Sequence, residues 1–456
     1  MTYSERHSTP RRGRPQGPRH VPRSSPSARS RRAGVVAAVA LAAALGLTPG
    51  AAAHPTAAPA AHPTAAPAAL PIAVPAAHPA AAPAPAPSAA PKPPVVVTLG
   101  DSYLSGEAGR WRGNSLVADA GGAGTDRTWE GDRAAYDTDR VYGATHTSGC
   151  HRSDVAAVRS AAITVGGRPL PMAQRVNLAC AGATAEAVLL PEDGGRAFKG
   201  ERPQAERLAE IAEDHDVELV VLSLGGNDLR FAEVVRGCAA AFLRPVGGRP
   251  CSKTSRAAVA DGLPRMRTAV AGAVASIRKA LAGAGQTEGG YRLVVQSYPG
   301  PLPPGARLRA FDSRYDRAAV GRCPFFDADL DWAHDDAVPA ISRTLAAVAE
   351  DAGAEFLDLS RAFEGREVCA RGTERATADV PPSGVSAEWA RFVVSGAGPG
   401  QVQESLHPNA YGQRALGACL ARVYGVRGFQ AHACVNVAGR GPEEMRLVST
   451  ATTVAG

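Results

Sequence analysis

A short apolar run that ends in a turn constrains the fold of this chain more than any other feature. Residues 95–99 read Val-Val-Val-Thr-Leu, and Gly100-Asp101-Ser102 follow at once. A run rich in β-branched residues and bounded by turn residues is typical of a strand buried on both faces of a parallel sheet. Such sheets bind ligands at the carboxyl ends of their strands, where Ser102 would lie. Gly, Asp and Ser are also common turn residues, so this segment alone does not distinguish a nucleophile from a turn.

Further strand-like runs alternate with helical patterns along the rest of the chain. We expect strands at 175–179, 217–224, 291–297 and 354–359, and helices at 201–213, 257–284, 335–352 and 409–424. Strands separated by helices favour a mainly parallel sheet with helices on both faces, which is a three-layer α/β/α arrangement. We therefore predict one α/β domain over residues 95–436, with long loops inserted into it and a C-terminal tail at 437–456.

The net charge of +7 is concentrated at the N-terminus. Residues 1–33 hold nine arginines and one acidic residue, whereas the remaining chain has 41 basic and 42 acidic residues. Because the body of the protein is nearly neutral, we expect no nucleic-acid partner. The basic segment is followed by an apolar run of about 15 residues, which is short for a membrane span, and then by Ala51-Ala52-Ala53. This order predicts a secretory signal peptide at 1–53 and leaves the Sec and twin-arginine routes open.

Residues 54–94 form a low-complexity segment rich in alanine and proline, in which residues 54–61 are repeated at 62–69. Such a composition predicts an extended, semi-rigid linker. The linker would either hold the domain at the cell wall or be an inert leader, and the sequence does not separate these two interpretations.

All eight cysteines follow the predicted signal peptide, and none is part of a C-x-x-C motif. Disulfides are therefore favoured over a metal site in an exported chain. Eight cysteines allow 105 pairings. We expect the sequential pairing, because each bond would then close a local loop, and the expected bonds are Cys150–Cys180, Cys238–Cys251, Cys323–Cys369 and Cys419–Cys434.

Three further segments carry residues that acyl transfer requires. Gly182 follows the strand expected at 175–179, at a point where backbone can approach a ligand closely. Asn227, which follows Gly225 and Gly226, offers a side-chain amide directly after another expected strand. His407 precedes the last expected helix, with Glu404 three residues before it. A serine, a histidine base, an acid and hydrogen-bond donors together indicate nucleophilic acyl transfer.

These four segments, in this order, resemble the conserved blocks of the SGNH (GDSL) hydrolases. The stretch from Gly100 to Glu107, together with Cys150-His151-Arg152-Ser153, resembles the secreted actinobacterial lipase and esterase branch of that family. The resemblance spans residues 95–425. It implies a flavodoxin-like α/β/α fold with a central, mainly parallel sheet.

The resemblance also implies a role for each of these positions. Ser102 would be the nucleophile and His407 its base, while the backbone N–H groups of Ser102 and Gly182 and the side chain of Asn227 would form an oxyanion hole. The family pattern has Asp where this chain has Glu404. Some secreted members use a main-chain carbonyl instead, so either Glu404 or a carbonyl would orient His407. We expect no cofactor and no metal.

We therefore expect a secreted lipase or esterase that cleaves carboxylic esters through an acyl-enzyme. Its partner would be a small-molecule or lipid ester, and it would act as a monomer. Phospholipid substrates and transient contact with a lipid interface stay open, because loops set the shape of the pocket. One alternative is a carbohydrate O-acetyl esterase that uses the same catalytic residues. The other is a non-catalytic cell-wall-binding protein, but the presence of intact Ser102, Asn227 and His407 argues against that interpretation.

Overall fold

A computed structural model describes residues 91–118, 120–395, 400–426 and 431–450. The predicted signal peptide and the linker up to residue 90 lie outside these ranges. No helix in the described ranges is long and apolar enough to cross a membrane.

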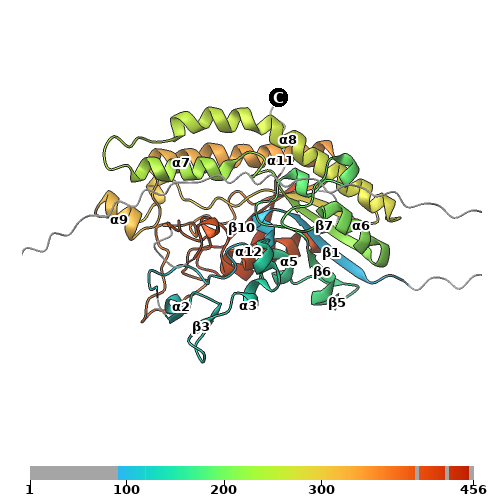
Figure 1. Cartoon of the computed structure of the whole chain (residues 1–456), viewed down its shortest axis with the longest axis horizontal. Helices are drawn as coiled ribbons and strands as arrows, with labels where there is room; N and C mark the ends of the chain where they lie inside the picture. The colour runs from blue at the N-terminus through green and yellow to red at the C-terminus, as the bar shows by residue number, and fades with distance from the viewer. Residues whose placement is uncertain (1–90, 119, 396–399, 427–430, 451–456) are drawn as a thin grey trace, which may run out of the picture. The chain divides into compact units, whose positions relative to one another are not determined.

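Within the described residues, seven strands form the central sheet, in the order β11-β10-β9-β8-β7-β1-β6 (Figure 1). Their bounds are β1 (Pro94–Gly100), β6 (Arg175–Asn177), β7 (Asp216–Ser223), β8 (Arg292–Gln296), β9 (Glu355–Asp358), β10 (Ala431–Val435) and β11 (Arg446–Ser449). All neighbouring pairs are parallel except β10 and β11. In the part of the chain that the structure describes, two short antiparallel pairs also lie outside this sheet, β2 (Trp129–Glu130) with β3 (Ala135–Tyr136) and β4 (Thr164–Val165) with β5 (Arg168–Pro169).

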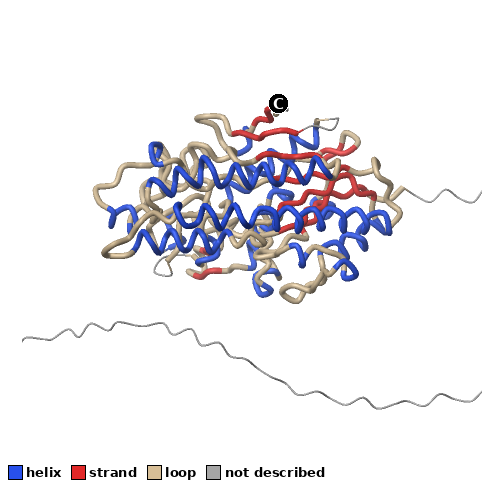
Figure 2. The backbone as a smooth tube through the Cα atoms, turned by 90° about the horizontal axis from the view of Figure 1, so that it is seen from above, coloured by secondary structure: helices blue, strands red, loops and turns tan. Residues whose placement is uncertain are grey.

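Helices cover both faces of the sheet (Figure 1), and the long ones run beside its strands (Figure 2). The longer helices are α6 (Gln204–Asp214), α7 (Phe231–Leu243), α8 (Ser252–Gly283), α11 (Val338–Asp351) and α12 (Ala410–Gly425). The short ones are α1 (Ser102–Ser105), α2 (Ala120–Ala123), α3 (Asp139–Tyr142), α4 (Thr145–Ser148), α5 (Ala157–Ser160), α9 (Arg314–Ala319) and α10 (Asp327–Trp332). On one face α8 packs against α6, α7 and α11, and on the other α12 packs against α5.

The apolar patterns of the sequence account for these layers. In β1, Val95, Val96, Val97 and Leu99 are all fully buried, as a strand covered on both faces requires. In α8, buried residues recur at a helical spacing of three or four along the side that faces the core. The predicted three-layer α/β/α class with a mainly parallel sheet is therefore confirmed.

The domain continues past the boundary predicted at residue 436. Strand β11, which lies in the segment predicted as a tail, pairs with β10 at the edge of the sheet. Its residues are mostly exposed, so the segment lacks the apolar run that reveals an inner strand. Helix α7 and strand β10 were not among the predicted elements either.

The eight cysteines form four disulfides in the sequential order expected above, and each closes a local loop. The bonds join residues that are 30, 13, 46 and 15 positions apart in the chain. In the chain-entropy model, each loop closure of this size stabilises the folded state by about 3–4 kcal/mol.

Candidate active site

The carboxyl ends of three adjacent strands meet at one edge of the sheet. Strand β1 lies between β6 and β7 and is parallel to both. The chain passes from β1 to β6 on one side and then to β7 on the other, which makes β1 a topological switch point where α/β proteins bind ligands. Ser102, Gly182 and Asn227 follow β1, β6 and β7 respectively. The topology thus brings three of the predicted residues to one place.

Close packing of β1 against β7 dictates the glycine that precedes the candidate nucleophile. Gly100 has φ +136°, and a Cβ there would lie 1.9 Å from the carbonyl oxygen of Ser223. The carboxylate of Asp101 then caps α1 by accepting a hydrogen bond from the backbone N–H of Tyr103 at 3.1 Å. Ser102 is the first residue of that helix, so its side chain is held at the sheet edge.

Ser102 and His407 are in direct contact. The distance from His407 Nε2 to Ser102 Oγ is 2.7 Å, and His407 Nδ1 lies 3.1 Å from the carbonyl oxygen of Ser405. A carbonyl oxygen only accepts hydrogen bonds, so Nδ1 carries the proton and Nε2 presents its lone pair to the serine hydroxyl. This is the tautomer that a general base for Ser102 requires.

The surroundings of His407 favour the neutral imidazole. Burial lowers the pKa of His407 below its ordinary value of 6.5, while the negative charge of Glu107 and the carbonyl of Ser405 act in the opposite direction. The ring of Tyr103 lies 5.0 Å from the imidazole ring, and its hydroxyl donates to the carbonyl of Leu406 at 3.3 Å. A neutral imidazole that is supported on several sides therefore faces Ser102 near neutral pH.

The structure does not bring the carboxylate of Glu404 to His407. Glu404 is buried and accepts hydrogen bonds from Trp111 Nε1 at 2.9 Å and from the backbone N–H of Gln401 at 2.8 Å. The second contact is part of a capping box that turns the carboxylate back toward the start of its own turn. Of the two candidates left open by the sequence, the main-chain carbonyl of Ser405 is the one that lies at His407 Nδ1.

Glu404 belongs instead to a buried charged cluster. The guanidinium of Arg391 lies 3.7 Å from the ring centroid of Trp111, and Arg391 is fully buried. Burial raises the pKa of Glu404, and the positive charges of Arg391 and Arg110 oppose that rise. Burial likewise lowers the pKa of Arg391 to about 9, and Glu404 opposes that change. The negative charge of Glu404 and the positive charge of Arg391 therefore each offset part of the cost of burying the other.

Candidate oxyanion donors lie beside Ser102. Within the described residues, the backbone N–H groups of Ser102 and Gly182 make no hydrogen bond to protein. Gly182 is an exposed residue with φ +85°, a conformation that suits glycine. Asn227 Nδ2 donates to the carbonyl of Ala183 at 2.9 Å, and an amide nitrogen has a second hydrogen to donate.

Tyr298 and Asp228 connect these segments, although the sequence predicted no role for either side chain. The hydroxyl of Tyr298 donates to Asp101 Oδ2 at 2.5 Å and accepts from the backbone N–H of Gly226 at 3.0 Å. Asp228 Oδ1 accepts from the backbone N–H of Ala185 at 3.1 Å. Tyr298 follows β8, the strand next to β7. The rule that chemistry gathers at strand ends was the signal that could have found it.

A second buried histidine lies in this region and contacts a carboxylate. His151 Nδ1 is 2.8 Å from Glu107 Oε1, and both side chains are buried. Glu107 follows α1 and lies five residues after Ser102 in the chain. Its charge acts on His407, as noted above. His151 pairs with Glu107, whereas His407 is the histidine in contact with Ser102.

The chain is similar to a known family and to several solved structures. The model of the GDSL-like lipase/acylhydrolase family matches residues 98–415. Similar solved structures include an extracellular lipase from Streptomyces rimosus, with 21% identity, 73% of this chain and 100% of that chain covered, and a TM-score of 0.39. Another is phospholipase A1 from Streptomyces albidoflavus NA297, with 18% identity, 74% and 100% covered, and a TM-score of 0.41. No match was found among the curated proteins.

The family model spans well over half of the chain and includes every residue placed above at the sheet edge. The chain therefore belongs to the GDSL-like lipase/acylhydrolase family and is a carboxylic ester hydrolase.

Proposed function

We propose that this protein is an exported serine esterase or lipase that forms an acyl-enzyme on Ser102 with His407 as its base. The observation that carries the proposal is the 2.7 Å contact between Ser102 Oγ and His407 Nε2. The hydrogen bond of the opposite ring nitrogen to the Ser405 carbonyl supports it, because it leaves Nε2 free to take a proton.

In the first half of the reaction, Ser102 Oγ attacks the carbonyl carbon of the ester and its proton moves to His407 Nε2. The tetrahedral intermediate carries its negative charge on the former carbonyl oxygen. The N–H groups of Ser102 and Gly182 and the amide of Asn227 would stabilise that charge. His407 then gives the proton to the leaving alkoxide, and the acyl group stays on Ser102.

In the second half, water attacks the acyl-enzyme and gives its proton to His407. The C–O bond to Ser102 breaks, His407 returns the proton to Ser102 Oγ, and the carboxylic acid leaves. The Ser405 carbonyl holds the imidazole and accepts its Nδ1–H throughout. It carries no full charge, so it would stabilise the imidazolium less than a carboxylate does.

Two features support export. The four disulfides are typical of proteins that fold in an oxidising compartment. The N-terminal sequence has the basic, apolar and small-residue regions of a signal peptide. The substrate class that we propose is a carboxylic ester of an alcohol or a lipid, with acyl-chain length to be measured.

The test is hydrolysis of p-nitrophenyl esters from C2 to C16 by the chain from residue 54 onward, combined with labelling by a fluorophosphonate. We expect the wild type to hydrolyse at least one ester and to be labelled once. Ser102→Ala should lose labelling and at least about 10⁴-fold of kcat, as in other serine hydrolases without their nucleophile.

Ser449→Ala is the matched control, because Ser449 is an exposed serine on β11 at the far edge of the sheet. It should keep wild-type labelling and rates. Labelling that persists in Ser102→Ala would overturn the proposal, as would a folded wild type that is inert to every ester in the series.

A further inference from the structure

Lys199 lies at the tip of a tight turn that places it beside the candidate oxyanion hole. The backbones of Phe198 and Glu201 exchange two hydrogen bonds, at 2.9 and 3.0 Å, across Lys199 and Gly200. Both central residues have positive φ, +50° for Lys199 and +79° for Gly200, as type I′ turns require. A lysine is uncommon in that conformation and adds strain, which native structures tend to retain at functional positions.

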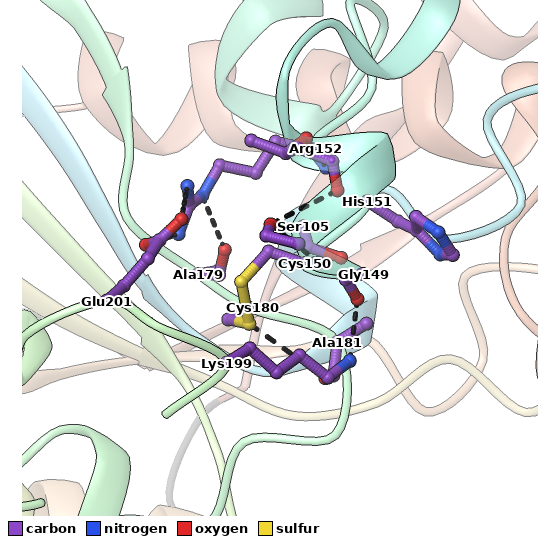
Figure 3. The surroundings of a disulfide bond; sticks show 12 residues. Ser105, Gly149, Cys150, His151, Arg152, Ala179, Cys180, Ala181, Lys199 and Glu201 are labelled. Atoms are coloured by element: carbon purple, nitrogen blue, oxygen red, sulfur yellow. Dashed lines mark hydrogen bonds and ion pairs between the residues drawn. A yellow bond between two sulfur atoms is a disulfide. The ribbon is translucent and has the colours of Figure 1, made fainter. Parts of the chain in front are cut away.

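The turn is tied to the sheet by a charged clamp. Glu201 forms an ion pair with Arg152, which also donates to the carbonyls of Ala179 and Leu178 at 2.7 and 3.0 Å. These two carbonyls lie just after β6, in the segment that leads to Gly182. The position of Lys199 is thus fixed relative to the end of the strand (Figure 3).

The ammonium of Lys199 bonds to two carbonyls, one on each side of a disulfide. Its Nζ donates to Gly149 at 2.6 Å and to Ala181 at 2.7 Å, next to Cys150 and Cys180 respectively (Figure 3). The carbonyl of Ala181 belongs to the same peptide group as the N–H of Gly182. Lys199 therefore bonds to one end of the peptide whose other end is a candidate oxyanion donor.

Hydrogen bonds on the two ends of one peptide group strengthen each other. A positive charge at the carbonyl oxygen draws electron density from the amide nitrogen, so the N–H becomes a stronger donor. Bonds from an ammonium are charge-assisted and stronger than bonds between neutral groups. A donor that is polarised before the reaction stabilises charge that develops in the transition state more than it stabilises the neutral ester.

We propose that Lys199 is a positioning residue that orients and polarises the Ala181–Gly182 peptide as an oxyanion donor. This inference rests on the proposed function and deepens it. Lys199 touches neither the substrate nor Ser102, and it acts on the reaction through the peptide group. The strained turn is then maintained because it delivers a cation to the carbonyl side of that peptide.

A purely structural interpretation makes a different prediction. The same two hydrogen bonds tie together the two arms of the Cys150–Cys180 loop, so their loss could lower stability alone. In that case the variants would have lower melting temperatures, with kcat unchanged at temperatures where they are folded. A role in polarising the peptide lowers kcat and the affinity for an oxyanion-bearing inhibitor by the same factor.

The experiment compares Lys199→Met, Lys199→Gly and Lys199→Arg by kcat, KM, melting temperature and inhibition by an alkyl trifluoromethyl ketone. Ser102 adds to that ketone and leaves an oxyanion in the hole. Lys199→Met should lower kcat about tenfold and the affinity for the ketone about tenfold, and KM should stay within about twofold of the wild type. A tenfold loss is smaller than the loss expected when an oxyanion donor is removed outright. Lys199→Gly, which suits the positive φ, should show the same kinetic loss, and Lys199→Arg should recover most of it.

Lys253→Met, at an exposed lysine near the start of α8, is the control for the lost charge and should match the wild type. The proposal is overturned if Lys199→Met and Lys199→Gly keep kcat within about twofold of the wild type. It is equally overturned if their loss is confined to KM or to anionic esters, which would indicate head-group binding. An inactive wild type would instead refute the proposed function itself.

Discussion

The two halves of the candidate active site are held in place by different means. Ser102, Gly182 and Asn227 follow three adjacent parallel strands, so the sheet itself sets their spacing. His407 comes from an irregular stretch before α12, far from these residues in sequence. Its position depends on contacts with Tyr103 and Ser405, and on the backbone of Arg391, whose N–H donates to the carbonyl of His407.

This difference separates what topology specifies from what packing specifies. A parallel sheet brings the ends of its strands together whatever side chains follow them. The histidine stretch has no such template and needs side chains from several segments to fix it. Substitutions at the strand ends should therefore affect the chemistry, whereas substitutions in the buried cluster of Glu404, Trp111 and Arg391 should first affect stability.

The largest effect that sharpens this comparison is expected for Asn227→Ala. Loss of the amide removes one of the proposed oxyanion donors, and removal of such a donor lowers kcat by about 10²–10³-fold in serine hydrolases. The side chain also donates to Ala183, so a small decrease in melting temperature accompanies the loss. Steady-state kinetics on the best p-nitrophenyl ester, with a thermal melt, would measure both effects.

Asn436→Ala is the matched control for this prediction. Its amide also bonds to backbone carbonyls, those of Ala362 and Glu364, but it follows β10, three strands away from β7. It should lower stability without changing kcat. If Asn227→Ala also lowered stability without changing kcat, the side chain of Asn227 would have a structural role only and would not be an oxyanion donor.

The strand-end half could be predicted from sequence because its signals are local. Residues 95–102 contain both the buried strand and the serine that follows it, and 217–228 repeat this arrangement with Asn227. The structure bears out the strands at these positions. Lys199 was not predicted because its importance arises from its contact with Ala181, which no spacing in the sequence reveals. Tyr298 carried only the general signal of a residue that follows a strand, and its contacts with Asp101 and Gly226 are not visible in the sequence.

The histidine half was predictable only in part. The spacing from Glu404 to His407 suggests a carboxylate–imidazole pair, yet Glu404 contacts Trp111, almost three hundred residues earlier in the chain. A buried arginine, Arg391, supplies the charge that makes this arrangement tolerable. Contacts of that kind are non-local, so the sequence leaves Glu404 and a main-chain carbonyl as equal candidates.

An intermediate effect is expected for Glu404→Gln, and it falls on stability. The substitution removes the negative charge of Glu404, which together with that of Asp126 opposes the desolvation of the buried Arg391, and we expect the free energy of unfolding to fall by about 1–3 kcal/mol. Because the Ser405 carbonyl is the group at His407 Nδ1, kcat should fall less than about tenfold, whereas losing an acid that orients the base costs about 10⁴-fold. Chemical denaturation measures the loss of stability, and kinetics well below the melting temperature measure the change in kcat separately.

Glu213→Gln is the matched control, because it removes an exposed carboxylate from α6 and should change neither the free energy of unfolding nor kcat. A loss of several hundredfold in kcat for Glu404→Gln, with stability unchanged, would show that Glu404 does orient the base. In that case, side chains in both halves of the site would affect kcat directly, and the difference between the two halves would disappear.

The smallest effect concerns the pH profile and connects the two halves. Glu107 follows α1 in the strand-end half, and its negative charge raises the pKa of His407 in the other half. Glu107→Gln removes that charge but keeps an oxygen that can accept from His151. Since the base must be neutral to accept a proton, the acid limb of kcat/KM follows the pKa of His407.

The wild-type limb should have its midpoint below 6.5, because burial lowers the pKa of His407. In Glu107→Gln the midpoint should move to still lower pH, so the variant keeps a larger share of its activity in acid while its plateau rate at pH 8 changes little. Rate profiles from pH 4.5 to 9, with Glu213→Gln as the neutral control, measure the displacement. A midpoint that stays in place or moves upward would mean that Glu107 does not act on His407, and that the two halves are electrostatically independent.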